Sequence, residues 1–251
     1  MTNATLDIGN SRVKLARFSG GRLEDLQTFA VEPATWTTLV TTLTNHPVQN
    51  FIYSTVGATA PPARLLQLRR LVPGLVLELT ETTPLPFQND YASPATLGKD
   101  RLAALAGALA HYPGQACLVV DAGTCVTMDL LTADGRFIGG NISPGVQMRL
   151  RAMHEGTARL PRAEAAGTPP DLLGTDTDGA LRSGGIFGLQ LEIEGLYARL
   201  RQKFGPLTLV LTGGDAPLLA SLPETEIFAL PNLVLDGLNE ILNYNHEHHF
   251  A

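Results

Sequence analysis

Short runs of apolar and β-branched residues, broken by glycine turns, alternate along this chain with longer stretches of helical period. The first run, "TLDIGNSRVKLARFSGGRLEDLQTF", predicts three short strands that double back on one another. Further strands are predicted in "NFIYSTVGA", "LVLEL" and "TLVLTGG", and helices at residues 35–45, 61–72, 99–112, 146–155, 178–203 and 232–245. Residues 81–98 are rich in Thr, Pro and Asn and are predicted to be irregular. The pattern indicates a mixed α/β protein.

The strand-turn-strand pattern of the N-terminus occurs a second time from Cys117 onward. Aligned without gaps, "DIGNSRVKLARFSGGR" and "DAGTCVTMDLLTADGR" match Asp7 with Asp121, Gly9 with Gly123, Gly21 with Gly135 and Arg22 with Arg136. The shared spacing and context predict an internal duplication. We expect two halves of like topology, residues 1–115 and 116–251, with the last helix able to pack back on the first half.

Composition and charge remove several classes of function. The chain has 251 residues, 44% of them hydrophobic, which is enough for one large domain or two small ones. Its net charge is −6 and it has no long basic run, so nucleic acid is not an expected partner. No apolar run is long enough for a membrane helix, and the two cysteines form no zinc or disulfide pattern. We expect a cytoplasmic protein with no membrane partner.

The two Asp-x-Gly turns are candidate phosphate-binding sites. Such a turn offers backbone N–H groups and short polar side chains to an anion. Because a carboxylate would repel bare phosphate, each aspartate indicates a cation between the turn and a polyphosphate, as Mg²⁺ lies in nucleotide sites. A single copy would be ordinary hairpin geometry, but two copies favour a clamp on one nucleotide. A third turn, Gly213–Asp215, is either a contact for adenine or ribose or a plain strand-to-helix connection.

Candidate acceptor chemistry lies between the two halves, in "YASPATLGKDRLAAL". Asp100 and Arg101 occur there at a predicted helix start. An aspartate at this point can orient and deprotonate a substrate hydroxyl, and an arginine can hold a carboxylate through a forked pair of hydrogen bonds. The alternative is a helix-start acid paired with its neighbours. The chain has no GxxxxGK[ST] and no GxGxxG, so P-loop and dinucleotide-binding folds are not supported.

Four motifs, in order along nearly the whole chain, resemble the type III pantothenate kinase family. They are Asp7-Ile-Gly-Asn-Ser-x-x-Lys14, Tyr91-x-x-Pro94-x-x-Leu97-Gly98-x-Asp100-Arg101, Asp121-x-Gly-Thr124-x-x-Thr127-x-Asp129 and Gly139-Gly140-x-Ile142-x-Pro144-Gly145. The resemblance implies the α/β fold of the acetate and sugar kinase, Hsp70 and actin superfamily, with two duplicated ribonuclease-H-like halves and a nucleotide cleft between them. It implies ATP-dependent phosphorylation of pantothenate, the first step of coenzyme A biosynthesis.

The resemblance also implies a role for individual residues. The ATP phosphates would contact Asp7, Ile8, Gly9, Asn10, Ser11, Arg12, Val13, Lys14 and Thr124. Asp7 would lie near Mg²⁺, Asp121 would coordinate a potassium or ammonium ion, and Asp100 would be the catalytic base. The pantothenate site would be lined by Tyr91, Gly98, Lys99, Asp100, Arg101 and Thr177, with Thr177 reaching across a homodimer interface.

Three positions depart from the residues usual in this family. Lys99 replaces a small residue, Cys125 an alanine and Asp176 an asparagine. They leave substrate affinity and cation preference open. Two alternatives to the reaction also stay open: a non-catalytic transcriptional accessory protein on the same fold, and a kinase of the superfamily that acts on another small alcohol.

Overall fold

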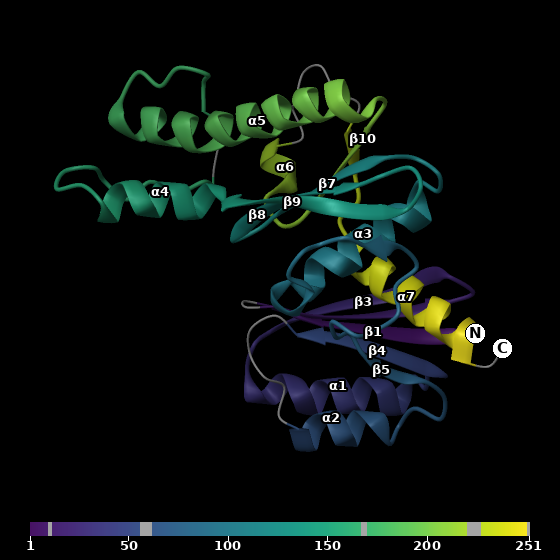
Figure 1. The fold of residues 1–251 in the computed structure, drawn as a ribbon. Helices are drawn as coiled ribbons and strands as arrows, with labels where there is room; N and C mark the ends of the chain where they lie inside the picture. The colour runs from purple at the N-terminus through teal and green to yellow at the C-terminus, as the bar shows by residue number, and fades with distance from the viewer. Residues whose placement is uncertain (10–11, 56–61, 167–169, 220–226, 250–251) are drawn as a thin grey trace. The chain divides into compact units, whose positions relative to one another are not determined.

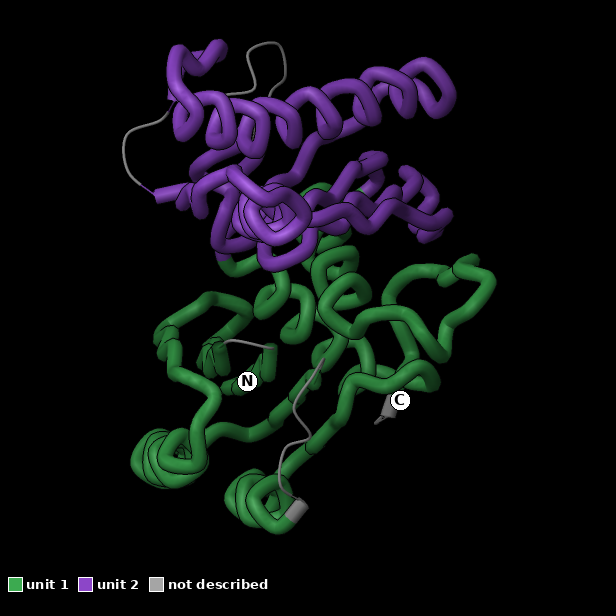
Figure 2. Tube along the Cα trace, turned by 90° about the vertical axis from the view of Figure 1, so that its left-hand side faces the viewer, with its two compact units in different colours: residues 1–113, 232–251 green, residues 114–231 purple. Residues whose placement is uncertain are grey.

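The computed structural model describes residues 1–9, 12–55, 62–166, 170–219 and 227–249. The chain forms two compact units, drawn in different colours in Figure 2. Unit 1 contains residues 1–113 and 232–251, and unit 2 contains residues 114–231. The chain therefore passes from the first unit to the second after Pro113, and its last helix belongs to unit 1.

Unit 1 is built on one sheet with the strand order β3-β2-β1-β4-β5. Its strands are β1 (Thr2–Ile8), β2 (Arg12–Ser19), β3 (Arg22–Ala30), β4 (Asn50–Thr55) and β5 (Val76–Glu78). The first three are antiparallel neighbours, whereas β4 runs parallel to β1 and β5. Helices α1 (Pro33–Asn45) and α2 (Pro62–Arg69) lie on one face, and α3 (Lys99–His111) and α7 (Leu233–His249) on the other (Figure 1). The segment predicted to be irregular holds the two-residue strand β6 (Gln88–Asn89) and the short helix η1 (Pro94–Thr96).

The side chains of β1 point alternately to the two faces of this sheet. Leu6 and Ile8 are buried in the apolar core that α1 and α2 complete. The intervening residues face α3 and α7, because successive side chains of a strand point to opposite faces. Asn3 on that face donates from Nδ2 to the side-chain oxygens of Asn239 and Asn243 on α7, both at 2.8 Å. Asp7 therefore emerges at the carboxyl end of β1 on the side of α3 and α7.

The backbones of helices α3 and α7 touch directly. A Cβ atom added to Gly237 would lie 1.7 Å from the carbonyl oxygen of Ala103 and 2.7 Å from the backbone nitrogen of Gly107. One added to Gly107 would lie 2.4 Å from the carbonyl oxygen of Leu233. The run "AALAGALA" is thus dense in small residues because this crossing leaves no room for larger ones.

Unit 2 repeats this arrangement with the strand order β11-β10-β7-β8-β9. Its strands are β7 (Cys117–Ala122), β8 (Cys125–Leu131), β9 (Arg136–Pro144), β10 (Thr208–Thr212) and β11 (Ile227–Ala229). Helices α4 (Val146–Glu155), α5 (Thr177–Phe204) and α6 (Ala216–Leu219) contribute to the apolar core on one face, where Leu118 and Val120 of β7 are buried. The alternation directs Asp121 to the opposite face. β11 and α6 were not predicted from the sequence.

The predicted duplication is confirmed by the two strand orders, which are the same when each strand is matched to its counterpart. The gap-free alignment is correct for β1 and β3 but wrong by one residue for β2. Asp7 pairs with Lys14, whereas Asp121 pairs with Thr127, so the counterpart of Lys14 is Thr127. The turn after Gly123 is one residue shorter than the turn after Gly9, and the next turn restores the alignment.

The described residues also show the character of the helices and the state of the two cysteines. None of the helices in the described part of the chain is long and apolar enough to span a bilayer. Cys117, which is buried, and Cys125, which is exposed, are both free thiols.

Candidate functional site

Asp7 is held at the end of β1 by residues of both neighbouring strands. Ser54 of β4 lies beside it and donates from Oγ to Asp7 Oδ1 at 2.8 Å, while Lys14 of β2 lies opposite. Burial raises the pKa of Asp7, the Ser54 hydrogen bond opposes this, the Asp100 charge raises the pKa further and Lys14 lowers it. Asp7 is thus a carboxylate whose negative charge is incompletely compensated by the protein.

Asp100 lies in the first turn of α3, near enough to Asp7 for their charges to interact. Its Oδ1 accepts a hydrogen bond from the backbone N–H of Arg101 at 2.9 Å. Gly98 precedes the helix as its N-cap, and a Cβ atom there would lie 2.4 Å from Asp100 Oδ1. Glycine at position 98 therefore leaves the space that the Asp100 carboxylate occupies. The structure brings together Asp7 and Asp100, two of the residues singled out in the sequence.

Arg101 is buried, with 4% of its surface exposed, and its guanidinium carbon lies 5.3 Å from the ring centre of Tyr91. A guanidinium over an aromatic face gains a cation–π interaction that is stronger where water is excluded. Tyr91 itself is fixed by a hydrogen bond from its backbone N–H to Asn89 Oδ1 at 3.1 Å. The irregular segment thus supplies a platform that orients Arg101 beside Asp100.

The first Asp-x-Gly turn is described in part. Gly9 donates from its backbone N–H to the carbonyl oxygen of Arg12 at 2.9 Å, which closes the turn. Asn10 and Ser11 lie outside the described residues. The side chains of Ile8 and Val13 are buried in the apolar core, so only their backbone groups remain for a phosphate.

The second Asp-x-Gly turn is also closed by its glycine, although it is one residue shorter. Gly123 donates from its backbone N–H to the carbonyl oxygen of Cys125 at 3.0 Å, and Thr124 at the tip is exposed. Thr212 of β10 lies beside Asp121, in the position that Ser54 has beside Asp7. Each of the two aspartates therefore has a hydroxyl residue on the neighbouring parallel strand.

Two further glycines, Gly145 and Gly213, pack against the second turn. A Cβ atom on Gly145 would lie 2.1 Å from the carbonyl oxygen of Gly123. The backbone N–H of Gly145 donates to the carbonyl oxygen of Thr124 at 3.2 Å. Gly213 has φ +94°, and a Cβ atom there would lie 2.2 Å from the carbonyl oxygen of Ala122 and 2.5 Å from Asp121 Oδ1. Both glycines therefore permit close backbone approach to the acidic turn.

Thr177 begins α5 and lies exposed on a pocket of about 530 Å³. The pocket is lined by Met153, Leu160, Gly174, Thr175, Asp176, Thr177, Ala180 and Leu181. Asp176 is the N-cap of α5 and accepts a hydrogen bond from the backbone N–H of Gly179 at 2.7 Å. Asparagine caps a helix in the same way, so the departure at position 176 preserves this local structure.

The described residues contain no group of three or more His, Cys, Asp or Glu side chains arranged to hold a metal ion. Mg²⁺ in many nucleotide sites needs no such group, because it is bound through one or two carboxylates together with phosphate oxygens and water. Asp7, an incompletely compensated carboxylate beside a second one, has the donor chemistry for such an ion.

Ser54 was missed in the sequence analysis. It lies 47 residues from Asp7, and only the parallel pairing of β1 with β4 brings the two together. A serine at the end of an apolar strand carries no distinctive signal, so the topology had to be known first.

Comparisons with known proteins agree with this geometry. A family model described as type III pantothenate kinase matches residues 4–199. A type III pantothenate kinase of Phocaeicola vulgatus is 41% identical over 97% of this chain and 98% of its own length, and one of Christiangramia forsetii is 38% identical with the same coverage.

Solved structures of lower identity show the fold. One is a conserved putative Baf family transcriptional activator of Campylobacter jejuni, with TM-score 0.64, 22% identity, and coverage of 96% of this chain and 98% of that chain. Another is the activator of the 2-hydroxyisocaproyl-CoA dehydratase of Clostridium difficile, solved with bound ADPNP, with TM-score 0.56, 13% identity, and coverage of 100% and 97%. These likenesses confirm the expected fold class, an α/β protein with two halves of like topology.

The match of the family model over most of the chain, with relatives of about 40% identity over nearly its full length, confirms the resemblance drawn from the four motifs. The chain belongs to the type III pantothenate kinase family.

Proposed function

We propose that this protein transfers the γ-phosphoryl group of ATP to the primary hydroxyl of pantothenate, forming 4′-phosphopantothenate in the first step of coenzyme A biosynthesis. Family membership supports the reaction. The observation that carries it to particular residues is the interaction between the charges of Asp7 and Asp100 within unit 1. Asp7 would face the metal-bound triphosphate and Asp100 the acceptor hydroxyl, so the two reactants would meet at the carboxyl end of β1.

Asp100 would act on the acceptor. The pantothenate oxygen forms a bond to the γ-phosphorus while the bond to the bridging oxygen of ADP breaks, and Asp100 accepts the hydroxyl proton. The transition state of phosphoryl transfer is loose, so positioning of the hydroxyl matters more than the strength of the base. Gly98, the backbone of Lys99, Arg101 and Tyr91 would complete the substrate site, with Arg101 offering its fork of N–H donors to the substrate carboxylate.

Asp7 and the first turn would hold the phosphates. Asp7 would hold Mg²⁺, which would supply positive charge to the phosphates during the transfer. Lys14, on the strand opposite Asp7, adds a fixed positive charge at the same place. The backbone N–H groups of residues 8–14 and the Arg12 side chain would provide the remaining contacts.

A monovalent cation would occupy the second turn, with Asp121 as its ligand and Thr124 on the phosphates. The two halves differ at this point, because the residue opposite Asp7 is Lys14, whereas the residue opposite Asp121 is Thr127. The second turn therefore has the carboxylate without a cationic residue at the matching position. A potassium or ammonium ion would supply that positive charge.

A homodimer would complete the pantothenate site, with Thr177 of the partner subunit reaching the substrate. Leu172, Leu173 and Leu191 support a protein interface on unit 2, because 65%, 80% and 64% of their surfaces are exposed. Leu172 and Leu173 are consecutive in the chain, and adjoining exposed apolar side chains often mark association surfaces.

One assay tests the proposed function. Purified protein is incubated with Mg-ATP and pantothenate, with sodium only, with potassium and with ammonium, and the product is identified by mass spectrometry. We expect phosphopantothenate with potassium or ammonium and far less with sodium alone. Absence of product under all conditions would favour the transcriptional accessory alternative, and phosphorylation of a different alcohol would favour another kinase of the superfamily.

A further inference from the structure

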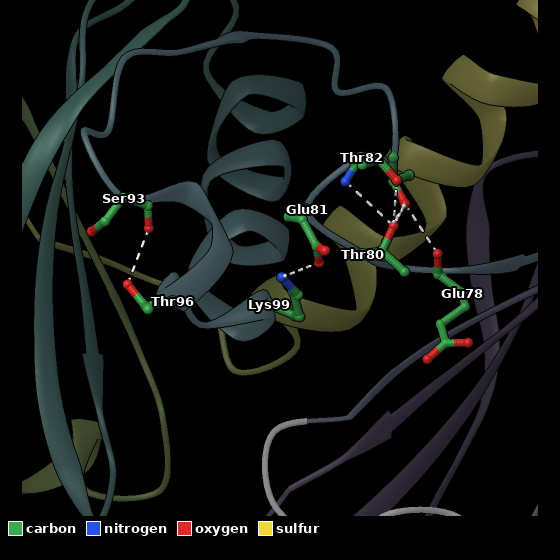
Figure 3. A network of polar contacts seen from close by, with 8 residues as sticks. Glu78, Thr80, Glu81, Thr82, Ser93, Thr96 and Lys99 are labelled. Atoms are coloured by element: carbon green, nitrogen blue, oxygen red, sulfur yellow. Dashed lines mark hydrogen bonds and ion pairs between the residues drawn. The ribbon is translucent and has the colours of Figure 1, made fainter.

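A polar network in unit 1 joins the end of β5 to the start of α3 (Figure 3). The turn at residues 80–83 is tied by threonines: Thr80 donates its N–H to Thr83 Oγ1 at 2.9 Å, and Thr83 Oγ1 donates to the carbonyl oxygen of Glu78 at 3.0 Å. The hydroxyl oxygens of Thr80 and Thr82 lie 3.1 Å apart. These contacts hold the turn that carries Glu81.

Glu81 reaches from this turn to Lys99, the first residue of α3. The two are joined by an ion pair of 3.4 Å between Glu81 Oε2 and Lys99 Nζ, with 49% and 16% of the side chains exposed. Among the described residues, Glu81 is the one partner recorded for the Lys99 ammonium. A hydrogen bond from the backbone of Glu81 lowers the pKa of its carboxyl group, and the hydrogen bond and charge of Lys99 lower it further. Glu81 is therefore a carboxylate at neutral pH.

Lys99 is the first residue of α3 and lies directly before Asp100, so its pairing with Glu81 affects the start of this helix. A positive charge at a helix N-terminus is unfavourable, because the backbone dipole is already positive there. Asp100 follows Lys99 directly, and within the described residues only its Oδ1 is engaged, by the N–H of Arg101. Without Glu81, the flexible Lys99 side chain would be free to approach the Asp100 carboxylate and compete with a substrate hydroxyl.

We propose that Glu81 is a positioning residue for phosphoryl transfer, which holds the Lys99 ammonium away from Asp100 and so leaves that carboxylate to the acceptor. This rests on the function proposed above for Asp100. A partly exposed ion pair contributes little to folding, so the effect of losing it falls on turnover and not on stability. Small misplacements of reacting groups are costly to rate.

Glu81→Gln tests the role, because it keeps the side-chain size and removes the charge. We expect kcat at saturating pantothenate to fall about tenfold, while the KM for Mg-ATP and the melting temperature stay near those of the wild type. Adding Lys99→Met to Glu81→Gln removes the released ammonium. The double variant should then have a kcat several times higher than Glu81→Gln alone, which a purely structural role would not produce.

Asp25→Asn is the matched control, since it breaks another ion pair of unit 1, Arg17–Asp25 at 3.6 Å, and should leave kcat unchanged. An unchanged kcat in Glu81→Gln, a loss that accompanies a fall in melting temperature, or a double variant no faster than Glu81→Gln would each overturn the inference. A wild-type protein that forms no phosphopantothenate would instead overturn the proposed function.

Discussion

Asp7 occupies a position that is unfavourable for a carboxylate in the unliganded protein. Burial and the neighbouring Asp100 both raise its pKa, while Ser54 and Lys14 offset only part of that rise. Active sites commonly keep such groups because a ligand or ion supplies the missing compensation. At the scale of single residues, stability and the proposed role in nucleotide binding would therefore make opposite demands on Asp7.

Asp7→Asn should separate the effect of Asp7 on stability from its proposed effect on nucleotide binding. The raised folded-state pKa means that stability from this group is present below its ordinary value of 3.8 and is lost as pH rises through the folded-state value. Asparagine cannot ionise and can still accept the Ser54 hydrogen bond. Near neutral pH without nucleotide we therefore expect a higher melting temperature than wild type, by roughly 2–4 °C for each kcal/mol regained. Differential scanning fluorimetry across pH measures this difference.

With Mg-ATP, the wild type should have a higher melting temperature than Asp7→Asn. Binding to the folded state raises the melting temperature of the wild type, whereas Asp7→Asn lacks the carboxylate proposed to hold the metal. Asp134→Asn is the control, since the Thr132 hydrogen bond lowers the pKa of Asp134 and its removal should not stabilise the protein. An equal Mg-ATP shift in wild type and Asp7→Asn would contradict the role of Asp7.

Asp100→Asn should lower kcat by about two to four orders of magnitude, the range typical of a general base. The Asn oxygen can still accept the Arg101 N–H, so the start of α3 and the melting temperature should be preserved. Binding of Mg-ATP, measured by calorimetry, should also persist. Near-normal turnover would show that another group takes the proton.

At the scale of elements, the crossing of α3 and α7 fixes the helix that carries Asp100. The contact is between backbones, so any side chain at Gly237 meets the Ala103 carbonyl. Neither partner is a flexible side-chain end that could move aside. Stability of this crossing should therefore be sensitive to a single methyl group.

Gly237→Ala should lower the free energy of unfolding by about 1–3 kcal/mol, the usual range for overpacking, even though alanine favours helix formation. Gly184→Ala is the matched control, because Gly184 lies within α5 and an added Cβ there meets no atom within 4 Å. That variant should be neutral or more stable by up to about 1 kcal/mol. Chemical denaturation compares the two, and equal stabilities would contradict the tight crossing.

The longer elements could be predicted because each has either a clear period or sufficient length. The strands of "TLDIGNSRVKLARF" alternate, α4 shows helical spacing, and α5 is a long run without proline. β11 and α6, with three and four residues, are too short for any periodicity. The register of β8 was missed because two turns of different length offset each other and leave the flanking glycines aligned.

Candidate chemistry-bearing residues could be predicted where they cluster in sequence, whereas the residues that support them from distant segments could not. Asp7, Asp100 and Asp121 lie in short motifs with glycine. Ser54 and Glu81 act on these motifs from distant segments, through strand pairing and an ion pair that no local pattern encodes. The groups proposed to react can therefore be predicted from sequence more readily than the groups that position them.

At the scale of the whole molecule, the proposed homodimer makes the site a shared one. Asp100 belongs to unit 1, whereas Thr177 begins α5 in unit 2. The exposed Leu172 and Leu173 immediately precede that helix start. If Thr177 of the partner subunit completes the pantothenate site, a defect at Asp100 in one copy and a defect at Thr177 in the other should fall in the same site and leave the second site intact.

Co-purified mixtures of two differently tagged variants, Asp100→Asn and Thr177→Val, test this arrangement. Alone, the first should be nearly inactive, and the second should have a raised KM for pantothenate with an unchanged KM for ATP. In a mixed dimer, one site receives both defects and the other receives neither, so the mixture should regain close to half of the wild-type activity per dimer at low pantothenate. Mixing Asp100→Asn with an Asp7→Asn partner is the control, because both defects belong to unit 1 and should yield no intact site. Recovery in the control, or none in the Thr177 mixture despite dimer formation by light scattering, would mean that each copy builds its pantothenate site alone.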